Sequence, residues 1–197
     1  MPMLRNPYVR SPTLEHTRTY MGSLMSFMVE GRHTTGRLAI SEFRSRPGHE
    51  PPPHIHERED EFYYILSGSM RVFCGAERLH AEAGDYVFVP QGAAHTFQVL
   101  SRELRMVIVV SSTDGRPVGL DRYFAEMGEP AASLELPSEA VTHVMDDPAR
   151  AISVAAKHGT RILSPDEAAR LMPNYPGFGA AQSTTNFEGM LRAKWPL

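Results

Sequence analysis

The sequence predicts an all-β fold, a small antiparallel sandwich or barrel, followed by a short helical extension at the C-terminal end. From residue 20 to residue 112, short β-rich segments are separated by Gly, Pro and polar residues. Several of these segments alternate apolar and polar residues with the period of two that a half-buried strand requires, and they recur roughly every 8–12 residues. After Asp114 the pattern becomes helical.

The expected strands are each bounded by turn residues. In chain order they are Tyr20–Glu30, Gly36–Ser45, Phe62–Leu66, Met70–Cys74, Tyr86–Pro90, His95–Leu100 and Leu104–Ser111. The first strand differs from the others because it carries large apolar side chains on both faces. A half-buried strand needs only one apolar face, so we expect this strand to be covered by a second layer or by a partner subunit.

Three short helices are expected to follow and to cover a barrel mouth or an edge strand. They are Leu120–Met127, Pro148–His158 and Pro165–Met172. The last has a strong start signal, with Ser164 as a cap, Pro165 in the first turn and acidic residues at the positive end of the helix dipole. Residues 173–197 have no clear period and are left unassigned. We divide the chain into an N-terminal arm (1–17), a barrel (18–112) and a helical or irregular extension (113–197).

Composition limits the partners of this chain. Its 197 residues carry a formal net charge of −3, which lacks the basic excess that binds nucleic acid or an anionic membrane. The longest apolar run, Met106–Val110, is too short to span a bilayer, and no apolar segment near the start suggests a signal peptide. The single cysteine, Cys74, precludes an internal disulfide and fits a reducing, cytoplasmic location.

Four residues have the spacing of metal ligands. His54 and His56 are two positions apart, so on a strand they share one face at about 6.5 Å, and the prolines at 51–53 stiffen the approach to them. Glu61 begins an alternating strand that could present its carboxylate beside the two imidazoles. Downstream, a strand, a Pro-x-Gly turn and a return strand would bring His95 to the same place as a fourth ligand.

Other acidic and histidine residues are interpreted as ordinary. Glu57, Glu59 and Asp60 are expected to be solvated charges in the turn before Glu61. Six histidines have no partner at ligand spacing: His16, His33, His49, His80, His143 and His158.

The segment around these ligands resembles the first cupin motif, G-x5-H-x-H-x4-E-x6-G, through Gly48, His54, His56, Glu61 and Gly68. The second motif, G-x5-P-x-G-x2-H, is matched by Gly84, Pro90, Gly92 and His95. Val99 departs from the pattern by replacing an Asn that is not a metal ligand in the family, which makes the pocket more apolar. The Pro-rich entry, the strand from Glu61 and residues 121–130 also resemble the single-domain quercetin 2,3-dioxygenase-like cupins.

Three imidazoles and a carboxylate suit one divalent first-row metal and leave two adjacent octahedral positions open for substrate oxygens or dioxygen. Fe²⁺ or Mn²⁺ is expected first, and Ni²⁺, Co²⁺, Cu²⁺ or Zn²⁺ could also bind. The substrate pocket is expected to contain Tyr63, Ile65, Phe97 and Val99, although inward aromatic residues in a small barrel are often only core. Such a lining favours a planar or aromatic ligand over a sugar nucleotide.

Three functions remain open at this point. The resemblance implies a metal-dependent dioxygenase that acts on an aromatic or enolisable hydroxy-carbonyl compound, such as a flavonol or polyketide, with Glu61 as both ligand and general base. The alternatives are a metal-dependent isomerase or cyclase without redox chemistry and a non-catalytic small-molecule-binding module. The resemblance also implies a homodimer, since cupin barrels commonly pair.

Overall fold

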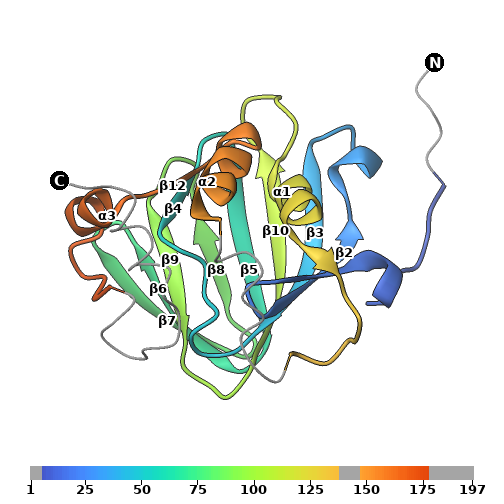
Figure 1. Cartoon of the computed structure of the whole chain (residues 1–197), viewed down its shortest axis with the longest axis horizontal. Helices are drawn as coiled ribbons and strands as arrows, with labels where there is room; N and C mark the ends of the chain where they lie inside the picture. The colour runs from blue at the N-terminus through green and yellow to red at the C-terminus, as the bar shows by residue number, and fades with distance from the viewer. Residues whose placement is uncertain (1–5, 138–146, 178–197) are drawn as a thin grey trace.

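Two antiparallel sheets face each other in the computed structural model, which describes residues 6–137 and 147–177 (Figure 1). The larger sheet contains, in spatial order, β11 (Glu129–Pro130), β1 (Thr17–Tyr20), β2 (Ser23–Val29), β3 (Leu38–Ser45), β10 (Leu104–Ser112), β5 (Glu59–Ser67) and β8 (Tyr86–Val89). The smaller sheet contains β12 (Thr160–Ile162), β4 (His54–His56), β9 (His95–Val99), β6 (Ser69–Cys74) and β7 (Glu77–Glu82). The expected all-β class is confirmed, as a jelly roll of two sheets that do not close into one barrel.

The helices are short and lie toward the C-terminal end, as expected. They are α1 (Leu120–Met127), α2 (Pro148–Lys157) and α3 (Pro165–Leu171), and two 3₁₀ turns, η1 (Leu14–His16) and η2 (Gly31–His33), lie near the N-terminal end. The α3 start signal acts as expected, because the Ser164 side chain accepts from the Glu167 N–H and Glu167 caps Ser164 in return. Among the described residues, no helix has the length and apolar character needed to cross a membrane.

The strand expected over Tyr20–Glu30 is present as β2, but the expectation is wrong at its start, where the chain forms a turn. The chain reverses at Met21 and Gly22, whose φ angles are 48° and 75°, so that Tyr20 pairs with Ser23 in a two-residue hairpin. Positive φ at both central residues suits the twist of such a hairpin, and Asn-Gly or Asp-Gly is its usual sequence signal. Met-Gly carries only half of that signal, so the turn was not visible in the sequence.

Both faces of β2 are covered from within the chain. Met25 and Phe27 join the main core between the sheets, whereas Leu24 packs on the other side with Ala131 and Leu136. The expected second layer is therefore supplied by residues that follow α1. This covering removes the argument from β2 for a partner subunit, and the homodimer stays a prediction.

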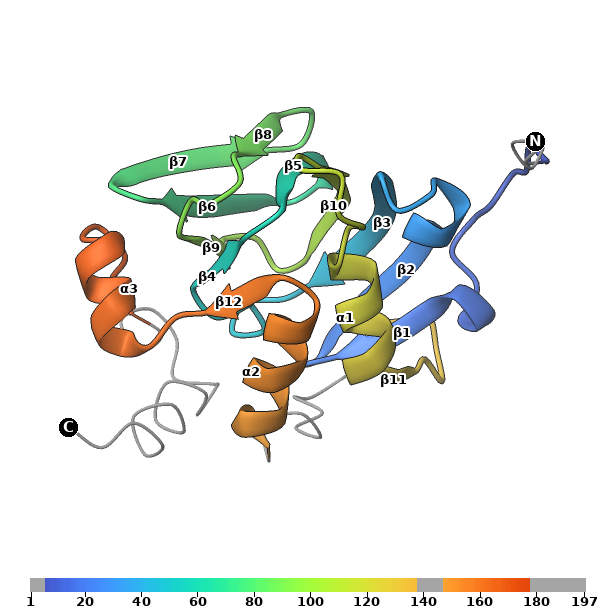
Figure 2. The same cartoon turned by 90° about the horizontal axis from the view of Figure 1, so that it is seen from above.

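The C-terminal extension forms part of both sheets. In the smaller sheet β12 pairs with β4, and in the larger sheet β11 pairs with β1. Helices α1 and α2 lie beside each other against the open side between the sheets, and α3 lies at the far end near β6 and β9 (Figure 2). Residues 178–197, the larger part of the segment left unassigned above, lie outside the described residues.

The turn between β5 and β6 is built for glycine. Gly68 has a φ of +87°, and a Cβ there would lie 2.3 Å from the carbonyl oxygen of Glu103. Gly84 has a similar φ of +98°, but a Cβ there would meet nothing within 4 Å. Comparison of the two positions separates the cost of the backbone conformation from the cost of the close contact.

We expect Gly84→Ala to lower the free energy of unfolding by about 1–2 kcal/mol, which is the cost of a left-handed backbone for a residue with a Cβ. Gly68→Ala adds a collision with backbone, so its loss is expected to be at least about 2 kcal/mol greater. Urea unfolding of the metal-free protein measures both values. Equal losses would show that the Glu103 carbonyl can move away without cost.

Candidate metal centre

Four buried side chains from three strands converge between the two sheets. His54 and His56 lie on β4, His95 lies on β9, and Glu61 lies on β5 of the opposite sheet. Each offers one ligand atom, and the four atoms all lie within 4.8 Å of one another. The structure therefore brings together all four residues that the sequence singled out as ligands.

The strand pairing explains this convergence. On β4 the alternation of side chains puts His54 and His56 on one face, and the register of β4 with β9 sets His54 directly opposite His95. Strand β5 lies close to β4 (Figure 2). The Glu61 carboxylate thereby comes within 3.0 Å of Nε2 of His95 and 3.3 Å of Nε2 of His56. Since β12 pairs with the other edge of β4, the two histidines lie on a strand hydrogen-bonded on both sides.

Backbone carbonyls fix the tautomer of two of the histidines. The Nδ1 atom of His54 lies 2.8 Å from the Pro52 oxygen, and that of His95 lies 3.0 Å from the Ala93 oxygen. A carbonyl oxygen can only accept, so in each ring Nδ1 carries the hydrogen and Nε2 keeps its lone pair for the centre of the cluster. Burial, followed by the charges of His95 and His56, holds the pKa of His54 well below its ordinary value, so this ring is neutral.

Glu59 contacts His56, the third histidine of the cluster. Sequence reasoning did not identify Glu59 as a site residue. Its side chain is 1% exposed, with Oε1 2.8 Å from Nδ1 of His56 and Oε2 accepting from the Gly119 N–H at 2.8 Å. The expectation that Glu59 is a solvated charge in the turn is wrong, because β5 already begins at this residue. Glu59 shares the alternation of Glu61 and Tyr63, all buried on the inner face, and that period was the available signal.

Glu61 lies among three polar groups. Its Oε2 atom accepts from the Tyr63 hydroxyl at 2.8 Å and lies 3.0 Å from Nε2 of His95 and 3.3 Å from Nε2 of His56. Burial alone would raise the pKa of Glu61, but the positive charge on His56 holds the pKa of Glu61 well below its ordinary value. Burial likewise opposes the charge of His56, yet Glu61 and Glu59 raise the pKa of His56 to about 10.

A divalent ion fits this arrangement. Within the part of the chain that the structure describes, the buried Nε2 atom of His56 has no hydrogen-bond partner. An ion with bonds of about 2.1 Å would place adjacent ligands about 3 Å apart. This is close to the 3.0 Å and 3.3 Å that separate Oε2 of Glu61 from Nε2 of His95 and Nε2 of His56. The cluster could therefore bind one metal through three nitrogens and an oxygen, and its donor set is compatible with several first-row ions.

The remaining histidines and the cysteine stand apart from this cluster. Among the described residues, no second group of side chains has metal-ligand spacing. His16, His33, His49, His80 and His158 are thus outside any such group, and His143 lies outside the described residues. Cys74 is a free, half-buried thiol on β6 and contributes no ligand to the cluster.

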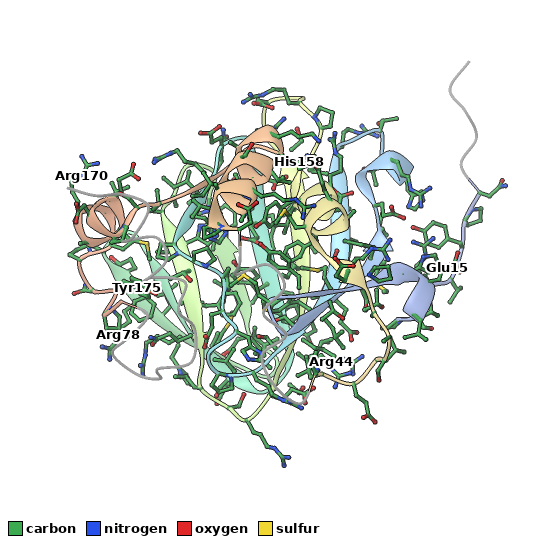
Figure 3. The ribbon with its side chains drawn as sticks, in the orientation of Figure 1. Glu15, Arg44, Arg78, His158, Arg170 and Tyr175 are labelled. Carbon is green, nitrogen blue, oxygen red and sulfur yellow. The ribbon has the colours of Figure 1, made fainter. Side chains whose placement is uncertain are left out.

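An apolar pocket of about 660 Å³, counting the space at its open mouth, adjoins the cluster. His54 and Glu61 belong to its wall, so two of the four candidate ligands face the pocket. Tyr63 and Phe97 line it as expected, whereas Ile65 and Val99 are buried in the core and do not line it. Among the described lining residues there is no Lys or Arg, and cationic side chains such as Arg44, Arg78 and Arg170 lie at the periphery (Figure 3).

Much of the pocket wall comes from segments that sequence reasoning did not assign to the site. These are the N-terminal hairpin, α1, α2 and β12, which contribute Tyr20, Met21, Ser23, Leu120, Tyr123, Phe124, Ala155, Thr160 and Ile162. His49, interpreted above as ordinary, also lines the pocket. No spacing in the sequence relates these residues to the ligands, because only the packing of the extension against the sheets brings them there.

Glu59→Gln is expected to weaken metal binding roughly 10–100-fold, since removing the carboxylate makes the His56 imidazole a poorer donor and loosens its orientation. Competition with a chelator of known affinity at fixed pH measures the loss. Glu57→Gln is the matched control, because it removes the same charge from an exposed residue two positions away. Equal affinities in the two variants would contradict the role assigned to Glu59.

Metal binding is also expected to release protons. With a pKa of about 10, His56 is protonated in the metal-free protein at pH 7 and must lose that proton to become a ligand. The apparent affinity should therefore rise by about tenfold per pH unit between pH 7 and pH 9 and level off above about 10. Calorimetry in buffers of different ionisation enthalpy should find about one proton released per ion at pH 7, and no release would contradict a charged His56.

Comparison with known proteins agrees with this centre. Residues 41–111, which contain all four ligands, match the family model described as a cupin domain. An uncharacterised protein of Streptomyces coelicolor is 30% identical over 90 residues, which make up 46% of this chain and 80% of that protein. Quercetin 2,3-dioxygenase of Bacillus subtilis is 24% identical over 108 residues. These residues make up 55% of this chain but only 31% of that relative.

A solved structure from Thermotoga maritima, described as a predicted oxalate decarboxylase, is 21% identical to this chain. It superposes with a TM-score of 0.47 over 54% of this chain and 100% of its own. The domain match and the Streptomyces relative together show that this chain belongs to the cupin superfamily.

Proposed function

We propose that this cupin is a metal-dependent dioxygenase that acts on an aromatic or enolisable hydroxy-carbonyl compound. The observation that carries the proposal is the opening of the ligand cluster, through His54 and Glu61, into an apolar pocket walled by aromatic side chains. A planar substrate can lie among these rings with its two adjacent oxygens toward the cluster. A bound iron or manganese ion would supply a Lewis acid and a redox centre with exchangeable positions.

Glu61 has two proposed tasks. It is a metal ligand, and it accepts the hydroxyl proton when the substrate enters the pocket. Its low pKa keeps it ionised at neutral pH, which both tasks require. Tyr63 donates to the same carboxylate and keeps its own proton, because burial and then the charge of Glu61 raise the pKa of Tyr63 well above its ordinary value. Tyr63 thus holds the carboxylate in place while Glu61 receives the proton.

The pocket lining supports an uncharged aromatic substrate. Phe97, Phe124 and Tyr63 offer ring faces and edges, and apolar side chains from α1 and α2 add to the lining of the pocket. A phosphorylated or nucleotide substrate would require cationic residues, which the described lining lacks. The match to quercetin 2,3-dioxygenase supports the same substrate class, since that relative is named for a reaction on a flavonol.

Oxygen uptake tests the proposal. Protein loaded separately with Fe²⁺, Mn²⁺ or Ni²⁺ is expected to consume oxygen with at least one member of a panel of flavonols and quinone-like polyketides. Glu61→Gln is expected to lower kcat by about 100-fold or more, because it removes the proton acceptor. His80→Gln, at an exposed histidine on β7, should leave uptake unchanged.

Two results would contradict the dioxygenase. Turnover that continues under argon and with redox-silent Zn²⁺ would indicate an isomerase or cyclase that uses the ion only as a Lewis acid. Tight binding of a panel member without turnover by any loaded form, and with affinity unaffected by Glu61→Gln, would indicate a binding module.

A further inference from the structure

Two tyrosine hydroxyls form a polar site in the otherwise apolar pocket wall. Tyr20, at the end of β1, and Tyr123, in α1, both line the pocket, and their hydroxyls hydrogen-bond to each other. Both side chains are buried, with exposures of 7% and 8%. Neither residue lies in the segment 41–111 that matches the cupin family, so this pair is an addition of the flanking segments.

The pair has unused hydrogen-bonding capacity. Two phenols carry two O–H donors, and their mutual hydrogen bond uses one of them. Among the described residues, neither hydroxyl has another hydrogen-bond partner, so one donor and several lone pairs are left. A buried donor without an acceptor is costly, and an oxygen atom of a ligand in the pocket would satisfy it.

Surrounding groups keep the two phenols neutral and in position. Burial raises the pKa of Tyr123 to about 12 and, together with the nearby Tyr123, raises that of Tyr20 well above its ordinary value. Both therefore retain their hydrogens at neutral pH. The ring of Phe124 packs edge-on against both, with centroid distances of 5.2 Å to Tyr20 and 5.5 Å to Tyr123, which restricts their rotation.

We propose that Tyr20 and Tyr123 recognise a second oxygen of the substrate, apart from the hydroxy-carbonyl that faces the ligand cluster. The substrate class is then a planar aromatic hydroxy-carbonyl compound that carries an additional ring hydroxyl or carbonyl. The cluster and the tyrosine pair lie in different walls of one pocket. The cluster reaches the pocket from β4 and β5, whereas the tyrosines reach it from β1 and α1. This inference rests on the proposed substrate class. The pair determines which substrate binds and does not contact the atoms that react.

Binding to Zn²⁺-loaded protein tests this site without turnover. The probes are 3-hydroxyflavone and a set of analogues that each carry one further hydroxyl at a different ring position, with Kd measured by fluorescence. Wild-type protein is expected to bind one analogue roughly tenfold more tightly than 3-hydroxyflavone. Tyr20→Phe/Tyr123→Phe should reduce this preference to less than about twofold, while the Kd of 3-hydroxyflavone itself changes little.

Tyr86→Phe is the matched control, because Tyr86 is 78% exposed, stacks on Tyr64 and does not line the pocket. It should keep the full preference. A second measurement uses only wild-type protein and stays informative if the double variant does not fold. Replacing the added hydroxyl of the preferred analogue by fluorine, which is similar in size but a poor acceptor, should remove the tenfold gain.

A purely structural role for the pair predicts that the double variant weakens all probes equally, and that result would overturn the proposal. So would a wild-type protein that binds every analogue as it binds 3-hydroxyflavone, or that binds none of them. The test is separate from oxygen uptake: a preference that depends on the two tyrosines, without oxygen consumption by any loaded form, would refute the dioxygenase and leave the recognition site standing.

Discussion

Burial of charge between the sheets is the constraint on which the site depends. Two carboxylates and three imidazoles lie in an apolar interior, where an unpaired charge would be very unfavourable. Backbone carbonyls, Glu59 and the Tyr63 hydroxyl meet this requirement around the outside of the cluster. The remaining capacity points inward, where three ring nitrogens and one carboxylate oxygen converge. A cation at this point could bind the atoms that these surrounding contacts leave free.

Glu59 also connects the ligand set to the pocket. One of its oxygens contacts His56, and the other accepts from Gly119, the residue before α1. Helix α1 then supplies Leu120, Tyr123 and Phe124 to the pocket wall. Because one buried carboxylate contacts both a metal ligand and the start of this helix, the position of the wall is tied to the position of the cluster. In this chain half of the residues that line the pocket come from segments outside the family match, whereas the four candidate ligands lie inside it.

Local signals explain which elements were predictable. The strands that match well, such as β3, β10 and β9, have an alternating or apolar run between turn residues, and α3 has its capping box in the sequence. The elements that were not predicted have no recognisable signal in the sequence around them. The hairpin at Met21 and Gly22 has an atypical turn sequence, and the three residues of β12 are a strand only because β4 offers them an edge. Such pairing is a property of the packed chain, so no short window contains it.

The four candidate ligands were predictable from local patterns that have a direct chemical meaning. These patterns are two histidines on one strand face, a carboxylate near the start of the next strand and a histidine after a Pro-x-Gly turn. The all-β class was also predictable, from period and turn spacing. Three features depend on packing between distant parts of the chain. Glu59 points inward to His56, Ile65 and Val99 lie in the core, and Tyr20 contacts Tyr123 across about a hundred residues of chain. The physical reason is that ligand spacing is set by the strand repeat, whereas a pocket wall is set by which distant surfaces bury one another.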